Sequence, residues 1–254
     1  MAVLVMDTAT ETLAVAVGEP NQLIGSASYR VARGHSTLLQ PVIQEVLLHA
    51  NVPMQSLSSI AVGIGPGSYT GVRIGVSTAK AMALALGIEL TTIPTLLTLA
   101  EAAAPGSPPN TTVLSLLYAR RQRAFGAIYR KLNNGRWAVV QNPQVRLVSD
   151  WIELFQAAKP HAPQSVMVPR SVIAHDFIER YGLFPALESA QAEEILHLGD
   201  VAGQFGPALL RLAGDGELPR AVGPEIHRIA PEYALPVEAE AKLAERGTPG
   251  HGNT

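Results

Sequence analysis

The chain has 254 residues, of which 47% are hydrophobic and 16% charged, with a net charge of −2. It is long and apolar enough to fold as one large domain or as two packed lobes. The slightly acidic balance argues against a protein that binds the phosphate backbone of nucleic acid. The lack of cysteine excludes disulfides and thiolate metal sites. With no basic leader before the first carboxylate and no apolar stretch long enough to span a bilayer, we expect a cytoplasmic protein.

The N-terminal part of the chain predicts a mixed α/β lobe. Apolar runs separated by polar turns predict three strands at residues 3–6, 13–17 and 23–29. A helix is expected to begin at Ser36 through its capping hydroxyl, with Pro41 close to its first turn. The elements expected next are a strand at 60–64, a helix at 72–86 that ends at Gly87, a strand at 89–93 and a helix at 95–103. This order predicts a central sheet with an antiparallel edge and helices against it.

A proline- and glycine-rich segment, residues 105–109, is the clearest linker in the chain. It sets the expected boundary between an N-terminal lobe, residues 1–104, and a shorter C-terminal lobe, residues 105–237. In the second lobe we expect strands at 112–118, 124–132, 137–147 and 166–168, a hairpin turn at Asn133-Asn134-Gly135, and helices from Asp150, at 171–181 and at 193–212. Residues 238–254 are expected to be a flexible tail.

The segment Gly65-Pro66-Gly67-Ser68-Tyr69-Thr70-Gly71 is rich in glycine but is not a Walker motif, because it lacks the Gly-Lys-Ser/Thr ending. Its glycines permit positive φ and the close approach of another backbone. Two compatible interpretations stay open. The segment is a tight strand-to-helix connection, or it leads into a helix that binds a partner.

The chain offers no recognisable catalytic or metal-binding pattern. Its seven histidines are scattered without paired ligand spacing. Ser68 is not in a Gly-x-Ser-x-Gly elbow, because Thr70 stands where the second glycine would be. We therefore expect no catalytic residue and no metal ligand.

Two segments together resemble the TsaB (YeaZ) family: Asp7-Thr8-Ala9-Thr10 after the first strand, and the glycine-rich stretch from Gly63 to Gly75. Ala119-Arg120-Arg121-Gln122-Arg123 and Ala230-Pro231-Glu232-Tyr233 support the resemblance, which extends to about residue 236. The chain departs from many relatives at Tyr118, where they carry an acidic residue. The resemblance implies the actin-like ATPase (ASKHA) fold: two RNase H-like lobes with mixed sheets flanked by helices, the second lobe shortened.

The resemblance also implies an accessory role. TsaB proteins are non-catalytic paralogues of TsaD, which transfers threonylcarbamoyl to the adenosine next to the tRNA anticodon. The implied partners are TsaD, bound as a heterodimer, TsaE, and a second copy when the chain is alone, with tRNA contacted through the complex. The resemblance implies that the chain has no cofactor of its own and that ATP or ADP is bound at the partner interface. TsaD relatives carry two metal-binding histidines where this chain has Thr95 and Leu99.

Two helices, residues 36–49 and 73–86, are apolar around much of their circumference. Such helices are buried either inside the fold or against a partner. The resemblance implies the second, because the family pairs these helices with those of a partner. The expected interface residues are Leu38, Leu39, Val42, Ile43, Val46, Tyr69, Arg73, Val76, Ala79, Lys80 and Ala83.

Four residues are candidates for contact with nucleotide or RNA: Asp7, Thr8, Arg120 and Arg121. In actin-like ATPases an acidic residue after the first strand helps to hold metal near the phosphates. For Asp7 we favour a turn-capping role, and for the arginines a solvated strand edge over phosphate contact. An active nucleotide-binding ATPase or small-molecule kinase using Asp7 stays the alternative, and a standalone tRNA-binding module is disfavoured by the acidic balance.

Overall fold

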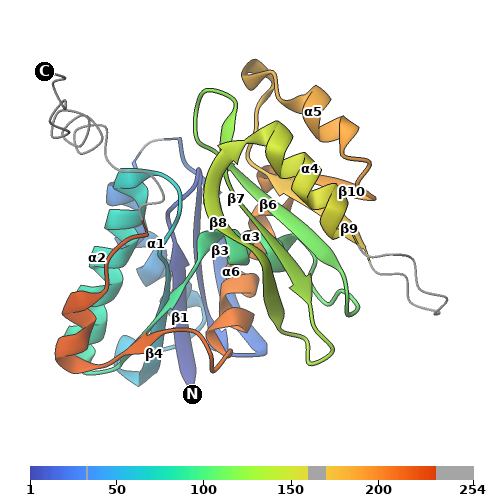
Figure 1. Ribbon diagram of the computed structural model, residues 1–254. Coiled ribbons are helices and arrows are strands. Elements are labelled where there is room, and N and C mark those ends of the chain that lie inside the picture. Colours follow the sequence, from blue (N-terminus) through green and yellow to red (C-terminus); the bar gives the residue numbers. More distant parts are fainter. Residues whose placement is uncertain (33, 160–169, 233–254) are drawn as a thin grey trace, which may run out of the picture.

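Two β-sheets form the frame of the molecule (Figure 1). Their strands follow the same order, except that the first sheet has β11 as an additional edge strand. The computed structural model describes residues 1–32, 34–159 and 170–232. The first sheet has the order β11-β5-β4-β1-β2-β3 and the second the order β10-β9-β6-β7-β8. In each, two antiparallel hairpin strands follow the first strand, and two parallel strands extend the other side.

The strands are β1 (Ala2–Asp7), β2 (Thr12–Glu19), β3 (Gln22–Arg30), β4 (Leu57–Gly63), β5 (Glu89–Ile93), β6 (Thr112–Tyr118), β7 (Arg123–Lys131), β8 (Trp137–Leu147), β9 (Ser171–His175), β10 (Glu194–His197) and β11 (Arg220–Ala221). The helices are α1 (His35–His49), α2 (Tyr69–Leu86), α3 (Thr95–Ala103), α4 (Val148–Ala158), α5 (Phe184–Ser189) and α6 (Leu198–Ala213), with short 3-10 turns η1 (Met54–Ser56), η2 (Glu179–Tyr181) and η3 (Gly223–Arg228).

Helices and sheets alternate in layers. Helices α1 and α2 cover the outer face of the first sheet, α4 and α5 that of the second, and α3 and α6 lie between the sheets. Strand β1 shows why, since its side chains alternate between faces: Leu4 and Met6 pack with α1 and α2, whereas Val3 and Val5 belong to the core between the sheets. Among the described residues, no helix combines the length and the apolar character that crossing a membrane requires.

The last helix of each half packs on the sheet of the other half. Helix α6 contacts β1, β2 and β3, and α3 contacts β6 and β7. Gly206 permits the close approach of α6, because a Cβ there would lie 3.0 Å from the Cβ of Ala16. The two halves are therefore interlocked through a common core.

A buried carboxylate on α3 also joins the halves. Glu101 accepts hydrogen bonds from Lys131 Nζ at 2.7 Å, Trp137 Nε1 at 2.6 Å and Arg211 Nε at 2.6 Å. Burial acts to raise the pKa of Glu101, but these donors outweigh it and hold the pKa below its usual value. The carboxylate is thus ionised and links α3 to β7, β8 and α6.

The chain returns to the first sheet at its C-terminal end. Residues 219–232, which we call the C-terminal strap, lie along α2 (Figure 1). Strand β11 pairs with β5, Ile226 is fully buried in the core beneath α2, and the Glu232 N–H donates to the Ile64 carbonyl at 2.8 Å. The strap is therefore part of the outer layer over the first sheet.

The predicted fold class is confirmed: both halves are mixed sheets flanked by helices in the RNase H-like strand order. Most predicted elements agree within two residues, including the hairpin turn at Gly135, where φ is 79°. The predicted lobe boundary at residue 104 stays a prediction. The predicted strand at 166–168, Tyr233 and the tail at 238–254 lie outside the described residues.

Three local predictions are wrong. Helix α1 begins at His35 without a side-chain cap, because Gly34 with φ 104° makes the turn, and Pro41 lies inside the helix. The predicted helix at 171–181 is instead strand β9 followed by η2, since its short apolar run is buried between β6 and β10. The predicted helix at 193–212 begins only at Leu198, after strand β10.

Candidate functional site

Asp7 lies at the end of β1 and is fully buried. Its Oδ1 accepts a hydrogen bond from the Ala9 N–H at 2.7 Å, and its Oδ2 accepts one from the Thr95 hydroxyl at 2.8 Å. The first of these is the turn-capping contact expected from the sequence. Burial raises the pKa of Asp7 to about 6, against the opposing effect of both hydrogen bonds. Both oxygens are engaged by protein donors.

The glycine-rich segment closes over the turn that follows Asp7. The Ser68 N–H donates to the Ala9 carbonyl at 2.6 Å, and the Thr8 hydroxyl donates to the Gly71 carbonyl at 2.7 Å. A Cβ at Gly67 would lie 2.1 Å from the Ala9 oxygen, and a Cβ at Gly71 would lie 2.1 Å from the Thr8 oxygen. Glycine is needed at these positions because two backbones touch.

This arrangement does not fit a metal-bound nucleotide at the β1 turn. Such a ligand needs a free carboxylate and exposed N–H groups at the turn and helix start. Here Asp7 is covered, Thr8 is buried, and Ser68 caps α2 by accepting from the Gly71 N–H at 3.2 Å. The backbone of the glycine-rich segment lies directly against the carbonyls of Thr8 and Ala9 in this turn.

Thr95 and Leu99, which stand where TsaD relatives have histidines, both have structural roles. The Thr95 hydroxyl accepts from the Gly65 N–H at 3.1 Å while donating to Asp7, and Leu99 is fully buried in the core. Within residues 1–32, 34–159 and 170–232, no group of three or more His, Cys, Asp or Glu side chains is placed to hold a metal ion.

The equivalent turn of the second half, between β6 and β7, is different. Arg120, Arg121 and Gln122 have consecutive positive φ values of 67°, 50° and 58°, and all three are exposed. The Arg123 N–H donates to the Arg120 carbonyl at 3.0 Å and closes the turn. Three left-handed residues without glycine make a strained turn that holds its two arginine side chains in solvent.

Asp176, the residue that follows β9, contacts the end of β6 just before this turn. Its Oδ1 accepts a hydrogen bond from the Tyr118 N–H at 2.6 Å. Burial raises the pKa of Asp176 to about 7, and the charge of Glu11, on the turn after β1, raises it further. Tyr118, which replaces the acidic residue of many relatives, stacks on Tyr181 with ring centroids 3.6 Å apart.

The predicted interface helices α1 and α2 lie side by side on the outer face of the first sheet. Most of the predicted interface side chains are covered by the chain's own sheet and are not available for contact; these are Leu39, Val42, Ile43, Val46, Val76, Ala79 and Ala83. The exposed ones are Leu38 at 40%, Tyr69 at 43%, and Arg73, whose guanidinium lies 3.9 Å from the Tyr69 ring centroid. Leu48, which the sequence interpretation did not single out, is 76% exposed on α1.

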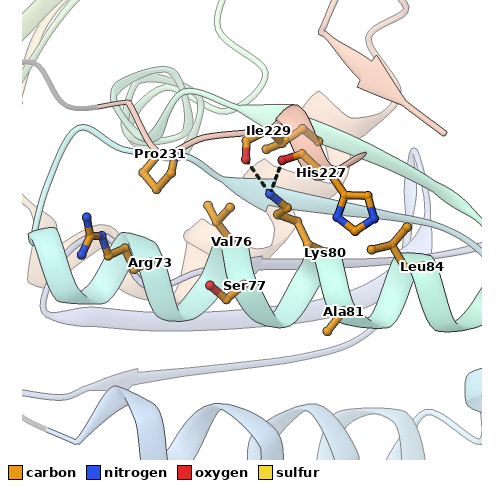
Figure 2. A pocket seen from close by; sticks show the side chains of 9 residues that line it. All are labelled: Arg73, Val76, Ser77, Lys80, Ala81, Leu84, His227, Ile229 and Pro231. Carbon is orange, nitrogen blue, oxygen red and sulfur yellow. Dashed lines mark hydrogen bonds between the residues drawn. The ribbon is translucent and has the colours of Figure 1, made fainter. Parts of the chain in front are cut away.

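A groove of about 540 Å³ runs between α2 and the C-terminal strap (Figure 2). Its lining residues are Arg73, Val76, Ser77, Lys80, Ala81, Leu84, His227, Ile229 and Pro231. Lys80 reaches across it, and its Nζ donates to the carbonyls of His227 at 2.9 Å and Ile229 at 2.8 Å. Helical periodicity alone does not reveal the strap's part in this surface, because its residues are distant in sequence.

Three comparisons identify the family. Residues 26–209 match the family model described as "TsaD: tRNA N6-adenosine threonylcarbamoyltransferase". The Bacillus subtilis (strain 168) protein named "tRNA threonylcarbamoyladenosine biosynthesis protein TsaB" is 30% identical over 248 residues, which cover 96% of this chain and 99% of that protein. The Escherichia coli (strain K12) protein of the same name is 33% identical over 138 residues, 54% of this chain and 58% of that protein.

The fold agrees with these sequence matches. The solved structure described as "YeaZ from Pseudomonas aeruginosa" has a TM-score of 0.67 and 22% sequence identity, and the match covers 91% of this chain and 99% of that one. It shows that the two chains share their fold. The sequence and structural matches together establish that this chain belongs to the TsaB (YeaZ) family.

Proposed function

We propose that this chain is a non-catalytic subunit in the formation of threonylcarbamoyladenosine in tRNA, and that it activates the threonylcarbamoyltransferase TsaD by binding it as a heterodimer. The observation that carries the proposal is the closed β1 turn. Asp7 has both oxygens engaged and the glycine-rich segment lies against its backbone. This argues against an active ATPase or kinase that relies on Asp7, which is the alternative.

The α1–α2 face supports a binding role. It exposes Leu38 and Leu48 on α1 and Tyr69 on the adjacent helix α2, which also lines the groove along the strap. Exposed apolar groups gathered on one face are typical of association sites. The buried residues of the same helices contribute by fixing the helices on the sheet. Activation requires that the complex favours the active conformation of TsaD over its inactive one.

The remaining partners and ligands follow from the same proposal. We expect TsaE to complete the assembly, and the free chain to form a homodimer through the α1–α2 face. The chain has no cofactor of its own, and ATP or ADP would bind at the interface with the partner. Arg120 and Arg121 are the exposed cations of the strained turn after β6 and are the candidates for contact with tRNA phosphate or nucleotide there.

The test is light scattering of the chain alone and mixed with TsaD from the same organism, followed by a threonylcarbamoylation assay. We expect a one-to-one complex and an activity that depends on this chain. Leu38→Glu places a charge on the exposed side of α1, and we expect it to weaken the complex on the order of tenfold or more. The matched control is Ile195→Glu, on edge strand β10, where the side chain is similarly exposed at 39%.

Two outcomes would reject the proposal. One is full threonylcarbamoylation without this chain. The other is turnover of Mg-nucleotide by the isolated chain that Asp7→Ala abolishes, which would establish the ATPase or kinase alternative. Equal loss of binding in Leu38→Glu and Ile195→Glu would remove the α1–α2 face from the proposal.

A further inference from the structure

Lys80 is predicted from the sequence to contact a partner, but its amino group is used within the chain. It comes from the middle of α2, crosses the groove and donates to two carbonyls of the C-terminal strap, those of His227 and Ile229 (Figure 2). These carbonyls belong to the last turn of η3 and to the residue that follows it. The end of a helical turn leaves carbonyls without intrahelical donors, and a lysine there both satisfies them and complements their partial negative charge.

The strap is held near Lys80 by several further contacts, including Ile229, which packs against the core that contains the buried residues of α2. Upstream it is held by β11, by the Arg220–Glu89 ion pair at 3.1 Å and by the buried Ile226. Downstream it is held by the Glu232 N–H on the Ile64 carbonyl at 2.8 Å. Between Ile226 and Glu232, the hydrogen bonds of Lys80 are the ones that join the described strap to α2. Lys80 therefore supplies the hydrogen bonds that hold residues 227–231 to the helix, beside the apolar packing of Ile229.

We infer that Lys80 is a positioning residue, which fixes the C-terminal strap on α2 so that strap and helix present a single surface to the partner. The inference rests on the proposed function, since α2, one of the two helices of the proposed interface, forms one wall of the groove. Arg73, Ser77 and Ala81 line the helix side of the groove, and His227, Ile229 and Pro231 line the strap side. Without Lys80, a partner would have to order the strap at the moment of binding and would bind more weakly.

The chain contains a matched control. Lys159 at the end of α4 donates from its Nζ to the carbonyls of Ala190 and Gln191, both at 2.6 Å. These carbonyls follow the end of α5, so Lys159 makes the same kind of contact as Lys80 on the far side of the second sheet. Lys159→Ala removes two equivalent hydrogen bonds without touching the strap.

The experiment compares wild type, Lys80→Ala, Lys80→Arg and Lys159→Ala by amide hydrogen exchange and by titration with TsaD. In Lys80→Ala we expect exchange at the Ile229 and Glu232 amides to be on the order of tenfold faster, and affinity for TsaD to fall by about tenfold, because two charge-assisted hydrogen bonds are lost. Lys80→Arg keeps a cationic donor and should retain most of the affinity. Lys159→Ala should leave both readings unchanged.

Each failure has a distinct meaning. Unchanged exchange in Lys80→Ala, or faster exchange with unchanged affinity, overturns the inference while the proposed function stands. Equal loss of affinity in Lys159→Ala also overturns it, because the effect would then reflect general destabilisation. If wild type itself does not bind TsaD, the proposed function is overturned and the inference falls with it.

Discussion

The two halves of the molecule repeat one strand order but differ in the residues at the end of their first strands and in the turns that follow. After β1 stands Asp7, a buried carboxylate whose turn is sealed by the glycine-rich segment. After β6 stands Tyr118, stacked on Tyr181, followed by a strained turn with two exposed arginines. The strand order is thus the same in both halves, whereas the residue that ends the first strand is a buried carboxylate in one and a stacked tyrosine in the other.

The helices diverge as well. Helix α2 has 18 residues and carries the groove and the strap, whereas its counterpart α5 has six residues. The outer face of the first half is thus long, partly apolar and interrupted by a groove, as an association surface requires. The comparison teaches that two halves with one strand order can carry different outer faces, and that each half can be perturbed separately.

The largest effect is expected where the two halves are joined. Glu101→Ala leaves the buried Lys131 ammonium without its carboxylate, at side-chain exposures of 5% for Glu101 and 8% for Lys131. Removing one member of a buried ion pair costs about 3–5 kcal/mol. We expect a loss of this order in the free energy of unfolding, measured by urea denaturation. Glu217→Ala, which removes an exposed partner of Arg136, should cost less than about 1 kcal/mol. Similar losses for both would mean that Glu101 does not link the halves.

The second effect concerns pH and the end of β1. The pKa of Asp7 is raised from 3.8 to about 6, so the folded state binds more protons than the unfolded state between these values. Its contribution to stability is therefore present at low pH and is lost as pH rises through about 6. Asp7→Asn removes the titration. We expect the stability of the variant relative to wild type to rise by up to about 3 kcal/mol between about pH 4 and pH 7.

His175 in the second half supplies the control of opposite sign. Burial, assisted by the charge of His197 and opposed by that of Asp200, lowers the pKa of His175 from 6.5 to about 4. The unfolded state then binds more protons, so stability is lost as pH falls from 6.5 toward 4. His175→Gln should change the pH profile in the direction opposite to Asp7→Asn. Parallel changes in the two variants would contradict this account of both sites.

The smallest effect tests the sealed turn directly. Gly71→Ala places a Cβ against the Thr8 carbonyl at 2.1 Å, where the neighbouring atom is backbone and cannot move aside cheaply. We expect a loss of about 1–3 kcal/mol in the free energy of unfolding. Gly203→Ala, in α6 with no atom within 4 Å of the new Cβ, should be neutral or stabilising by about 0.5–1 kcal/mol. A neutral Gly71→Ala would show that the turn is open.

Local patterns predict the order of strands and helices well because hairpins and long amphipathic helices are encoded locally, whereas the two RNase H-like lobes are expected from the family resemblance. The strand at Ser171–His175 shows the limit, since five buried residues carry no periodicity that separates a strand from a helix. The site is harder, because its decisive contacts are distant in sequence. Nothing local reveals that Thr95 holds Asp7, that Glu101 meets Lys131 and Arg211, or that Lys80 binds the strap. Burial likewise decides which residues of α1 and α2 remain exposed.

The position of α6 has a consequence for synthesis of the chain. Strands β1 to β3 leave the ribosome first, but α6, which covers their inner face, is among the last elements made. Contacts between such distant segments form slowly, because a long loop must close before they are made. The apolar inner face of the first sheet therefore stays exposed to solvent while the rest of the chain is translated. We expect the nascent chain to need a chaperone's protection until residue 213 has emerged.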